Sequence, residues 1–271
     1  MGCTKIIGVH EFDALPADAP APDAAAFVSD TVGLYDPATR TFQMRMRNEP
    51  GPADLSFTFG NAGDIPIAGD WDGDGIDTIG VYRPTTANFL LRNSSSAGAA
   101  DVTFQFGGVV STYSPVVGDW DGNGTDTIGV YNSADGTFFL RNSNSMGSAD
   151  HSFTFGTGGA AWRPLVGDWN GDGIDSIGLF NADTADVYVK DTNSGGLADV
   201  AYKQLIFGAG ILPVVGDWND DGTDTVATYR SAVSEYALTN ALAPVSADIV
   251  LTFGTGNHLP LAGNWDGLPS L

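Results

Sequence analysis

The sequence contains a single cysteine, Cys3, among 271 residues, which excludes a disulfide within the chain and any cysteine-based zinc site. Basic residues are also scarce, 11 against 33 acidic ones, and a net charge of −22 argues against a nucleic-acid partner, because phosphate backbones are repelled. No apolar run approaches the roughly 18 residues that a transmembrane helix needs. Histidine occurs only at His10, His151 and His258, in unrelated contexts, and no Gly-x-Ser-x-Gly motif is present, so the sequence gives no indication of an enzyme.

Residues 1–26 have a composition of their own, because the stretch 15–26 is built almost entirely of alanine, proline and aspartate. It lacks apolar periodicity and is predicted to be a flexible tether. The start, Met1-Gly2-Cys3, resembles that of a mature bacterial lipoprotein, whose first residue is a lipidated cysteine followed by such a tether. That resemblance implies a lipid anchor at Cys3 and an extracellular or cell-surface location. The alternative is an incidental cysteine in a disordered tail.

The rest of the chain, residues 27–271, is organised by an internal repeat. The tripeptide Gly-Asp-Trp begins at Gly69, Gly118, Gly167 and Gly216, each 49 residues after the last, and the variant Gly-Asn-Trp begins at Gly263. A second motif, Asp-Thr-Ile-Gly-Val-Tyr or a close variant, follows each of the first four copies and also occurs at residues 30–35. Repeats of this length are typical of solenoids and propellers.

Each repeat contains four strand-like runs, for example residues 115–120, 126–131, 137–142 and 150–155. Four-stranded units of about 40–50 residues are typical of propeller blades. The series opens with a second strand, at residues 30–35, and ends with a first strand, at residues 259–265. We therefore predict an all-β fold, a five-bladed β-propeller of four-stranded antiparallel blades, with a ring closed by the N- and C-terminal strands.

An eight-residue acidic loop connects the first and second strands of four repeats. Oxygen-bearing side chains occupy four positions in every copy: position 1 is Asp70, Asp119, Asp168 and Asp217; position 3 is Asp72, Asp121, Asn170 and Asn219; position 5 is Asp74, Asn123, Asp172 and Asp221; and position 8 is Asp77, Asp126, Asp175 and Asp224. Position 6 is always glycine, and position 7 would offer a backbone carbonyl from Ile76, Thr125, Ile174 and Thr223.

This spacing matches the first half of an EF-hand loop, in which positions 1, 3 and 5 converge on Ca²⁺. Clustered carboxylates repel one another unless a cation lies between them. The alternative is an ordinary Asp-Gly or Asn-Gly hairpin turn without a metal. The fifth copy has Asn264 and Asp266, but residues 268–271 supply no further acid. We expect four structural Ca²⁺ ions, with the Asp70 loop binding most tightly because it carries the most charge.

The combination of a Phe-Gly pair, a Pro-Val-Val-Gly run and an acidic loop resembles the FG-GAP repeats of integrin α-subunit heads and bacterial surface proteins. The pairs begin at Phe59, Phe106, Phe155, Phe207 and Phe253. The resemblance implies calcium at the blade rim and partner binding on other surfaces. Two departures are evident: the integrin-type ring has seven blades rather than five, and its closing acid falls at loop position 9, which leaves open whether the acids at position 8 ligate.

Other repeated side chains fit structural roles. Trp71, Trp120, Trp169, Trp218 and Trp265 keep a fixed register, so we expect them to pack between blades rather than to stack on sugars. Arg45, Arg92, Arg141 and Lys190 share one position, where we expect salt bridges to neighbouring acids. We predict a monomeric, calcium-stabilised module for adhesion or scaffolding, with an unidentified protein or glycan ligand. The alternative is a multivalent lectin with equivalent sites between blades.

Overall fold

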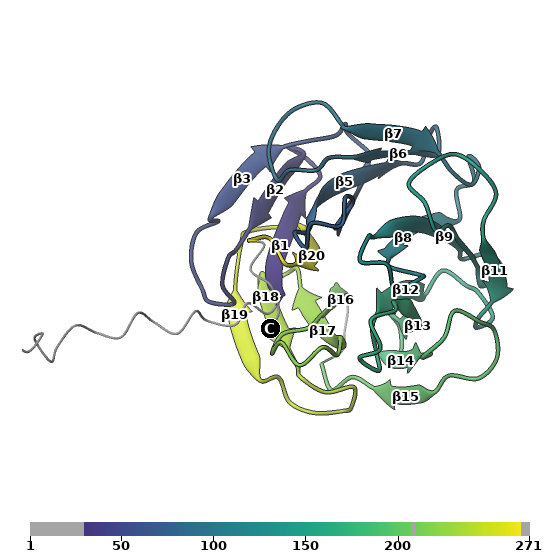
Figure 1. The fold of residues 1–271 in the computed structure, drawn as a ribbon. Coiled ribbons are helices and arrows are strands. Elements are labelled where there is room, and N and C mark those ends of the chain that lie inside the picture. The colour runs from purple at the N-terminus through teal and green to yellow at the C-terminus, as the bar shows by residue number, and fades with distance from the viewer. Residues whose placement is uncertain (1–29, 207–209, 267–271) are drawn as a thin grey trace, which may run out of the picture.

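The computed structural model describes residues 30–206 and 210–266, and in these residues the chain forms strands and no helix. Five four-stranded antiparallel sheets stand around a common centre, as Figure 1 shows. The prediction of a five-bladed β-propeller is confirmed. The predicted tether, residues 1–26, and Cys3 lie outside the described residues. Within the described part of the chain, no helix is long and apolar enough to cross a membrane.

The blades are numbered from the N-terminus, and the strands of each are given in spatial order. Blade 1 consists of β20 (Leu259–Gly263), β1 (Thr31–Asp36), β2 (Thr41–Met44) and β3 (Leu55–Thr58). Blade 2 consists of β4 (Ile65–Gly69), β5 (Thr78–Arg83), β6 (Asn88–Leu91) and β7 (Val102–Gln105). Blade 3 consists of β8 (Tyr113–Gly118), β9 (Thr127–Asn132), β10 (Thr137–Leu140) and β11 (His151–Thr154).

Blade 4 consists of β12 (Trp162–Gly167), β13 (Ser176–Asn181), β14 (Asp186–Val189) and β15 (Val200–Lys203). Blade 5 consists of β16 (Ile211–Gly216), β17 (Thr225–Arg230), β18 (Glu235–Leu238) and β19 (Ile249–Thr252). Each sequence repeat therefore forms one blade, except in blade 1, which combines strands from both ends of the chain.

The ring is closed by the pairing of β20 with β1. The two strands are antiparallel, with Thr31 opposite Gly263 and Tyr35 opposite Leu259. Blade 1 thus combines three strands from the beginning of the chain with one from its end (Figure 1). This is the closure that the offset of the sequence motifs predicts.

The apolar core lies between the blades. The first five residues of β5, β9, β13 and β17 are all buried, as are those of β1. One cluster joins Tyr131 and Phe138 of blade 3 to Ile177 and Leu179 of blade 4, and the other interfaces are built in the same way. A single blade therefore cannot bury its faces alone, which makes the closed ring the unit of stability.

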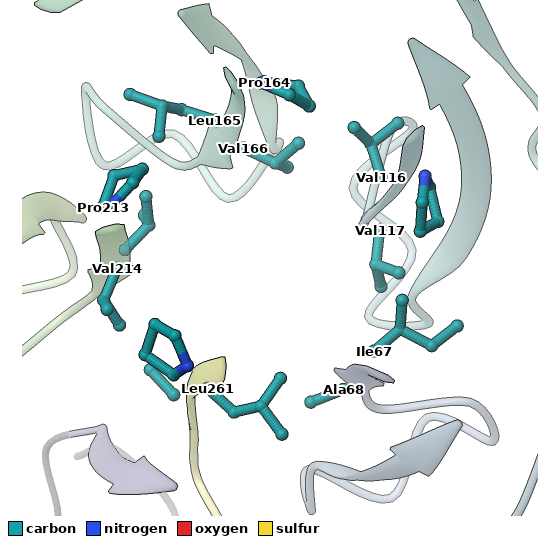
Figure 2. A pocket seen from close by; sticks show the side chains of 14 residues that line it. Ile67, Ala68, Val116, Val117, Pro164, Leu165, Val166, Pro213, Val214 and Leu261 are labelled. Atoms are coloured by element: carbon teal, nitrogen blue, oxygen red, sulfur yellow. The ribbon is translucent and has the colours of Figure 1, made fainter. Parts of the chain in front are cut away.

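The five innermost strands surround a central channel. Its wall is formed by aliphatic side chains and by a proline from several strands, as Figure 2 shows for Pro164 and Pro213. The cavity has a volume of about 230 Å³. Proline is tolerated here because these strands are sheet edges, and an edge strand needs no N–H donor on its open side. The acidic loops begin where the innermost strands end, so they lie around one end of this channel.

Candidate metal-binding loops and inter-blade clasps

The first residue of each acidic loop organises its loop through its carboxylate. Asp70 accepts hydrogen bonds from the backbone N–H groups of Gly73 at 2.8 Å, Asp74 at 3.2 Å and Gly75 at 2.7 Å. Asp119 and Asp168 accept the equivalent bonds, and Asp217 accepts N–H groups of Asn219, Asp221 and Gly222. The four loops therefore share one conformation, in which the backbone wraps around the carboxylate of position 1.

This wrap requires a left-handed backbone at two loop positions. Position 6 has φ near +80° in all four copies, where glycine avoids the steric cost of a side chain. Position 4 has φ between +72° and +75° at three glycines and +56° at Asp220. Aspartate is among the few residues with a side chain that tolerate this region. The fourth loop thus keeps the geometry without the glycine.

The side chains of positions 3 and 5 differ between the loops in an informative way. In the first loop, one carboxylate oxygen from each of Asp70, Asp72 and Asp74 lies within 4.8 Å of the others, a spacing that one cation could bridge. Partial burial and the charges of Asp74 and Asp70 raise the pKa of Asp72. In the third loop, position 3 is asparagine, and Asn170 Nδ2 donates to the Asp172 carboxylate at 3.1 Å.

The fourth loop repeats this second arrangement, with Asn219 Nδ2 donating to Asp221 at 2.9 Å. At position 7, the backbone N–H of Ile76, Thr125, Ile174 and Thr223 donates to the side-chain oxygen of position 5 in the same loop. In each loop the side chains of positions 1 and 5 therefore accept N–H groups of the loop backbone, and in the first loop the carboxylates of positions 1, 3 and 5 lie together.

Position 8 is placed differently. The Asp126 carboxylate of blade 3 accepts the backbone N–H of Asp70 in blade 2 at 2.8 Å, and the Asp126 N–H donates to the Asp70 carbonyl oxygen at 2.7 Å. Asp77 is not part of the three-carboxylate group of its own loop, because it makes the equivalent contacts with Asn264 of blade 1. Position 8 therefore joins neighbouring blades, and we call each reciprocal pair an inter-blade clasp.

Five clasps complete the ring. The partners are Asp77 with Asn264, Asp126 with Asp70, Asp175 with Asp119, Asp224 with Asp168, and Asp30 with Asp217. Asp30 belongs to the copy of the motif that has no loop before it, yet it takes the same place as the other four acids. This role of Asp30 was not predicted from the sequence, although the presence of aspartate in all five copies of the motif was a signal that it is needed in every blade.

The environment of the clasp carboxylates disfavours their ionised form. Burial raises the pKa of Asp77 to about 8, that of Asp175 to about 7 and that of Asp30 to about 6. Burial also raises the pKa of Asp126 and Asp224 well above the ordinary value. The negative charges of neighbouring clasp residues add to the effect, for example Asp77 and Asp175 on Asp126. Ionisation of all five clasp carboxylates at this end of the channel is therefore unfavourable.

The glycine of the Gly-Asp-Trp motif makes room for the clasp. A Cβ on Gly118 would lie 2.8 Å from Asp175 Cβ and 2.8 Å from Val166 Cγ1, and a Cβ on Gly167 would lie 2.8 Å from Asp224 Cβ. A Cβ essentially never lies this close to a non-bonded carbon atom, so a larger residue would displace the aspartate of the next blade. The tryptophan of the same motif is 3–6% exposed in all five copies, which confirms that it packs between blades.

The repeated basic side chain directly after the third strand anchors the following hairpin. Arg45 forms a salt bridge with Asp54 at 2.8 Å, and Lys190 lies 3.5 Å from Asp199. Arg141 lies 4.0 Å from Asp150 and also donates to the carbonyl oxygens of Ser145 and Ser148. Three of the four basic side chains therefore have the expected acidic partner. The fourth, Arg92, instead donates hydrogen bonds to carbonyl oxygens of its hairpin.

Two adjacent blade interfaces also carry open clefts with aromatic walls. The cleft between blades 3 and 4 has a volume of about 440 Å³ and contains Trp162 and Tyr188, whose ring centroids are 5.8 Å apart. The cleft between blades 2 and 3 has a volume of about 310 Å³ and contains Tyr113 and Phe139, 6.0 Å apart. The remaining blades have other residues at these two positions: Asp64 and Leu90, Ile211 and Ala237, and His258 and Gln43.

No family model matches the chain, and no curated protein matches it. Among solved structures, it is similar to a lectin of Agrocybe aegerita that recognises non-reducing terminal N-acetylglucosamine. The two are 16% identical, the alignment covers 83% of this chain and 76% of that chain, and the TM-score is 0.41. A likeness this distant says nothing about what this chain binds.

Proposed function

We propose that this propeller is a binding module for adhesion or scaffolding, whose acidic loops hold Ca²⁺ as structural clips. The observation that carries the proposal is the first loop, where carboxylate oxygens of Asp70, Asp72 and Asp74 lie within 4.8 Å of one another at an exposed turn. Three like charges at this separation are costly without a counter-ion. A rigid ring with few basic residues and no catalytic motif suits a binding role better than a catalytic one.

Calcium is the cation that fits these donors. The ligands offered are carboxylates, amide oxygens and the carbonyl of position 7, and the loops contain neither histidine nor cysteine. All-oxygen sites in loops of this kind favour Ca²⁺ over zinc or copper. We assign positions 1, 3, 5 and 7 of each loop as ligands, and position 8 to the clasp. A bound ion would neutralise the acids that the loop brings together.

The FG-GAP resemblance supports the same proposal from the sequence, because calcium in that family stabilises a propeller that binds partners. Under this proposal the chain is a monomer, secreted or held at the cell surface, and the lipoprotein-like start at Cys3 would supply the anchor. Mass spectrometry of the protein purified from its native membranes would test the anchor, since a diacylglyceryl cysteine has a defined mass.

Chelation tests the calcium proposal directly. An ion that binds only the folded state stabilises it by mass action, so excess EGTA should lower the melting temperature. The decrease should be larger at low ionic strength, where repulsion between loop acids is less screened. Metal analysis should find four calcium ions per chain. An unchanged melting temperature and no bound calcium would reduce the loops to metal-free turns.

The two aromatic clefts favour a second candidate, carbohydrate binding. Aromatic rings bind the apolar faces of sugar rings, and Trp162 and Tyr188 offer such a wall in an open cleft. The two aromatic pairs imply two such sites, rather than one in every blade. Glycan-array screening followed by calorimetry would test this: we expect a stoichiometry of two, and at least a tenfold loss of affinity at one site in Trp162→Ala. No glycan binding by the folded, calcium-loaded protein would exclude the lectin.

A further inference from the structure

One further position in each blade bears on the acidic loops. It is the second residue after the third strand, at the start of the hairpin that leads to the fourth strand. In the four blades with an acidic loop this residue carries a side-chain oxygen, as Asn93, Asn142, Asp191 and Asn240. In blade 1 it is Met46, and there the sequence after Trp265 places Leu268 at loop position 5. The oxygen is thus present where the loop is complete and absent where it is not.

The backbone at this position is the same in all five blades. The N–H of Asn142 donates to Asp150 Oδ2 at 2.8 Å, and the N–H of Met46 donates to Asp54 Oδ2 at 2.9 Å. The other three blades have the equivalent bond. Because the hairpins are anchored alike, the difference between blade 1 and the others lies in the side chain alone.

At two of these positions the side chain interacts with the loop of its own blade. The Asn93 side chain forms a hydrogen bond with the Asp72 carboxylate. The Asp191 carboxylate lies near enough to those of Asp172 and Asp168 to interact with them electrostatically. Asp191 therefore adds a third acid to a loop whose position 3 is the neutral Asn170.

The two remaining members leave a buried acceptor unused. The Oδ1 atoms of Asn142 and Asn240 are buried and have no hydrogen-bond partner among the described residues. An unsatisfied buried acceptor costs about 1–3 kcal/mol unless something binds it. A cation in the adjacent loop would satisfy the oxygen and gain a ligand at the same time.

We infer that Asn93, Asn142, Asp191 and Asn240 each supply an oxygen ligand that completes the cation site of the acidic loop in the same blade. The inference rests on the proposed calcium-binding function. Ca²⁺ takes six to eight oxygen ligands, more than positions 1, 3, 5 and 7 provide from single atoms, so an additional protein oxygen is needed unless water fills the place. The ligand also ties the loop to the hairpin, so that calcium would link three strands of one blade.

The test is a competition titration of the full chain with Ca²⁺ and a chromophoric chelator, which resolves the binding constants of individual sites. In Asn142→Leu we expect one of four sites to weaken by tenfold or more. In Asn142→Asp we expect one site to tighten, because a carboxylate replaces a neutral oxygen. The second variant keeps the test valid if the first does not fold. Met46→Asp adds the same charge in blade 1 and should leave all four constants unchanged.

The outcomes separate the two proposals. If the unaltered protein binds no calcium, the proposed function fails. If it binds four ions and neither Asn142 variant changes a constant, the hairpin ligand is overturned while the calcium function stands. Equal tightening in Asn142→Asp and Met46→Asp would also overturn it, because that result reports only the added charge.

Discussion

The carboxylate of Asp30 accepts a hydrogen bond from the backbone N–H of Asp217 at 3.0 Å, although 187 positions separate the two residues in the chain. The backbone N–H of Asp30 returns a bond of 2.8 Å to the Asp217 carbonyl oxygen. This clasp joins blade 5 to blade 1 beside the pairing of β20 with β1, so it fastens the ring where the chain is not continuous.

The closing clasp should contribute measurably to stability. In Asp30→Ala the Asp217 N–H loses its acceptor in a partly buried place, which we expect to cost about 1–3 kcal/mol. Asp30→Asn keeps an acceptor oxygen and removes a disfavoured charge, so its melting temperature at neutral pH should equal or exceed that of the unaltered protein. Thermal unfolding checks both, with Asp183→Ala as a control at an exposed site. Equal melting temperatures for Asp30→Ala and the control would contradict the role of the clasp.

The clasp carboxylates should also make the protein more stable in acid than in base. Their folded-state pKa values, about 8 for Asp77, about 7 for Asp175 and about 6 for Asp30, lie above the ordinary value of 3.8. The folded state therefore binds more protons than the unfolded state between these limits, and stability falls as pH rises through about 6 to 8. Melting temperatures in EGTA at constant ionic strength should decrease from about pH 5 to about pH 9.

The same measurement on Asp77→Asn isolates the effect from the repulsion of the whole acidic chain. That variant should show a flatter decrease than the unaltered protein, whereas Asp183→Asn, which removes an exposed charge, should not. A melting temperature that rises towards pH 9 would show that the clasp acids are ionised at little cost.

Close packing at the end of each innermost strand predicts a third result. In Gly118→Ala the new Cβ would meet Asp175 and Val166 at 2.8 Å, and we expect a loss of about 1–3 kcal/mol because the clasp must shift. Gly108→Ala is the matched control, since its Cβ would meet only Val110 Cγ2, at 3.8 Å. Chemical denaturation of both variants checks the difference. A similar loss in the two variants would mean that the glycine serves the strand backbone rather than the clasp.

The sequence predicted the features that follow from the spacing and order of motifs along the chain. The repeat length predicted four-stranded propeller blades. The offset between the first and last motifs predicted that residues 30–35 pair with residues 259–265. It also predicted the convergence of positions 1, 3 and 5 that the first loop shows, since these lie within five residues of one another. The role of position 8 was not predictable from spacing alone, because the partner of Asp126 is Asp70, which lies 56 residues away on another blade.

The aromatic clefts were not predictable for the same reason. Tyr113 and Phe139 lie on different strands of one blade, and Phe106 of the same cleft comes from the blade before it. Each residue has a counterpart in every repeat, and only the folded ring shows which counterparts meet. The expectation of equivalent sites in all blades followed from the repeat, whereas the side chains that form the clefts differ between the copies.

Asparagine at position 3 provides a natural comparison for the last prediction. Asn170 and Asn219 donate to the carboxylate at position 5 of their own loops, whereas Asp72 has no such donor and adds a third negative charge. We therefore expect Asp72→Asn to have effects of opposite sign in the two metal states. Without calcium it should raise the melting temperature slightly, because repulsion falls and a bond to Asp74 can form.

With calcium present, Asp72→Asn should lower the melting temperature, because the first loop loses a charged ligand and its affinity falls by about tenfold. The reverse change, Asn170→Asp, should destabilise the calcium-free protein and tighten one calcium site. Melting curves in EGTA and in excess calcium, measured for both variants, test the reversal of sign. A shift in the same direction in both metal states would show that position 3 acts only on the conformation of the loop, and that no calcium ion depends on its charge.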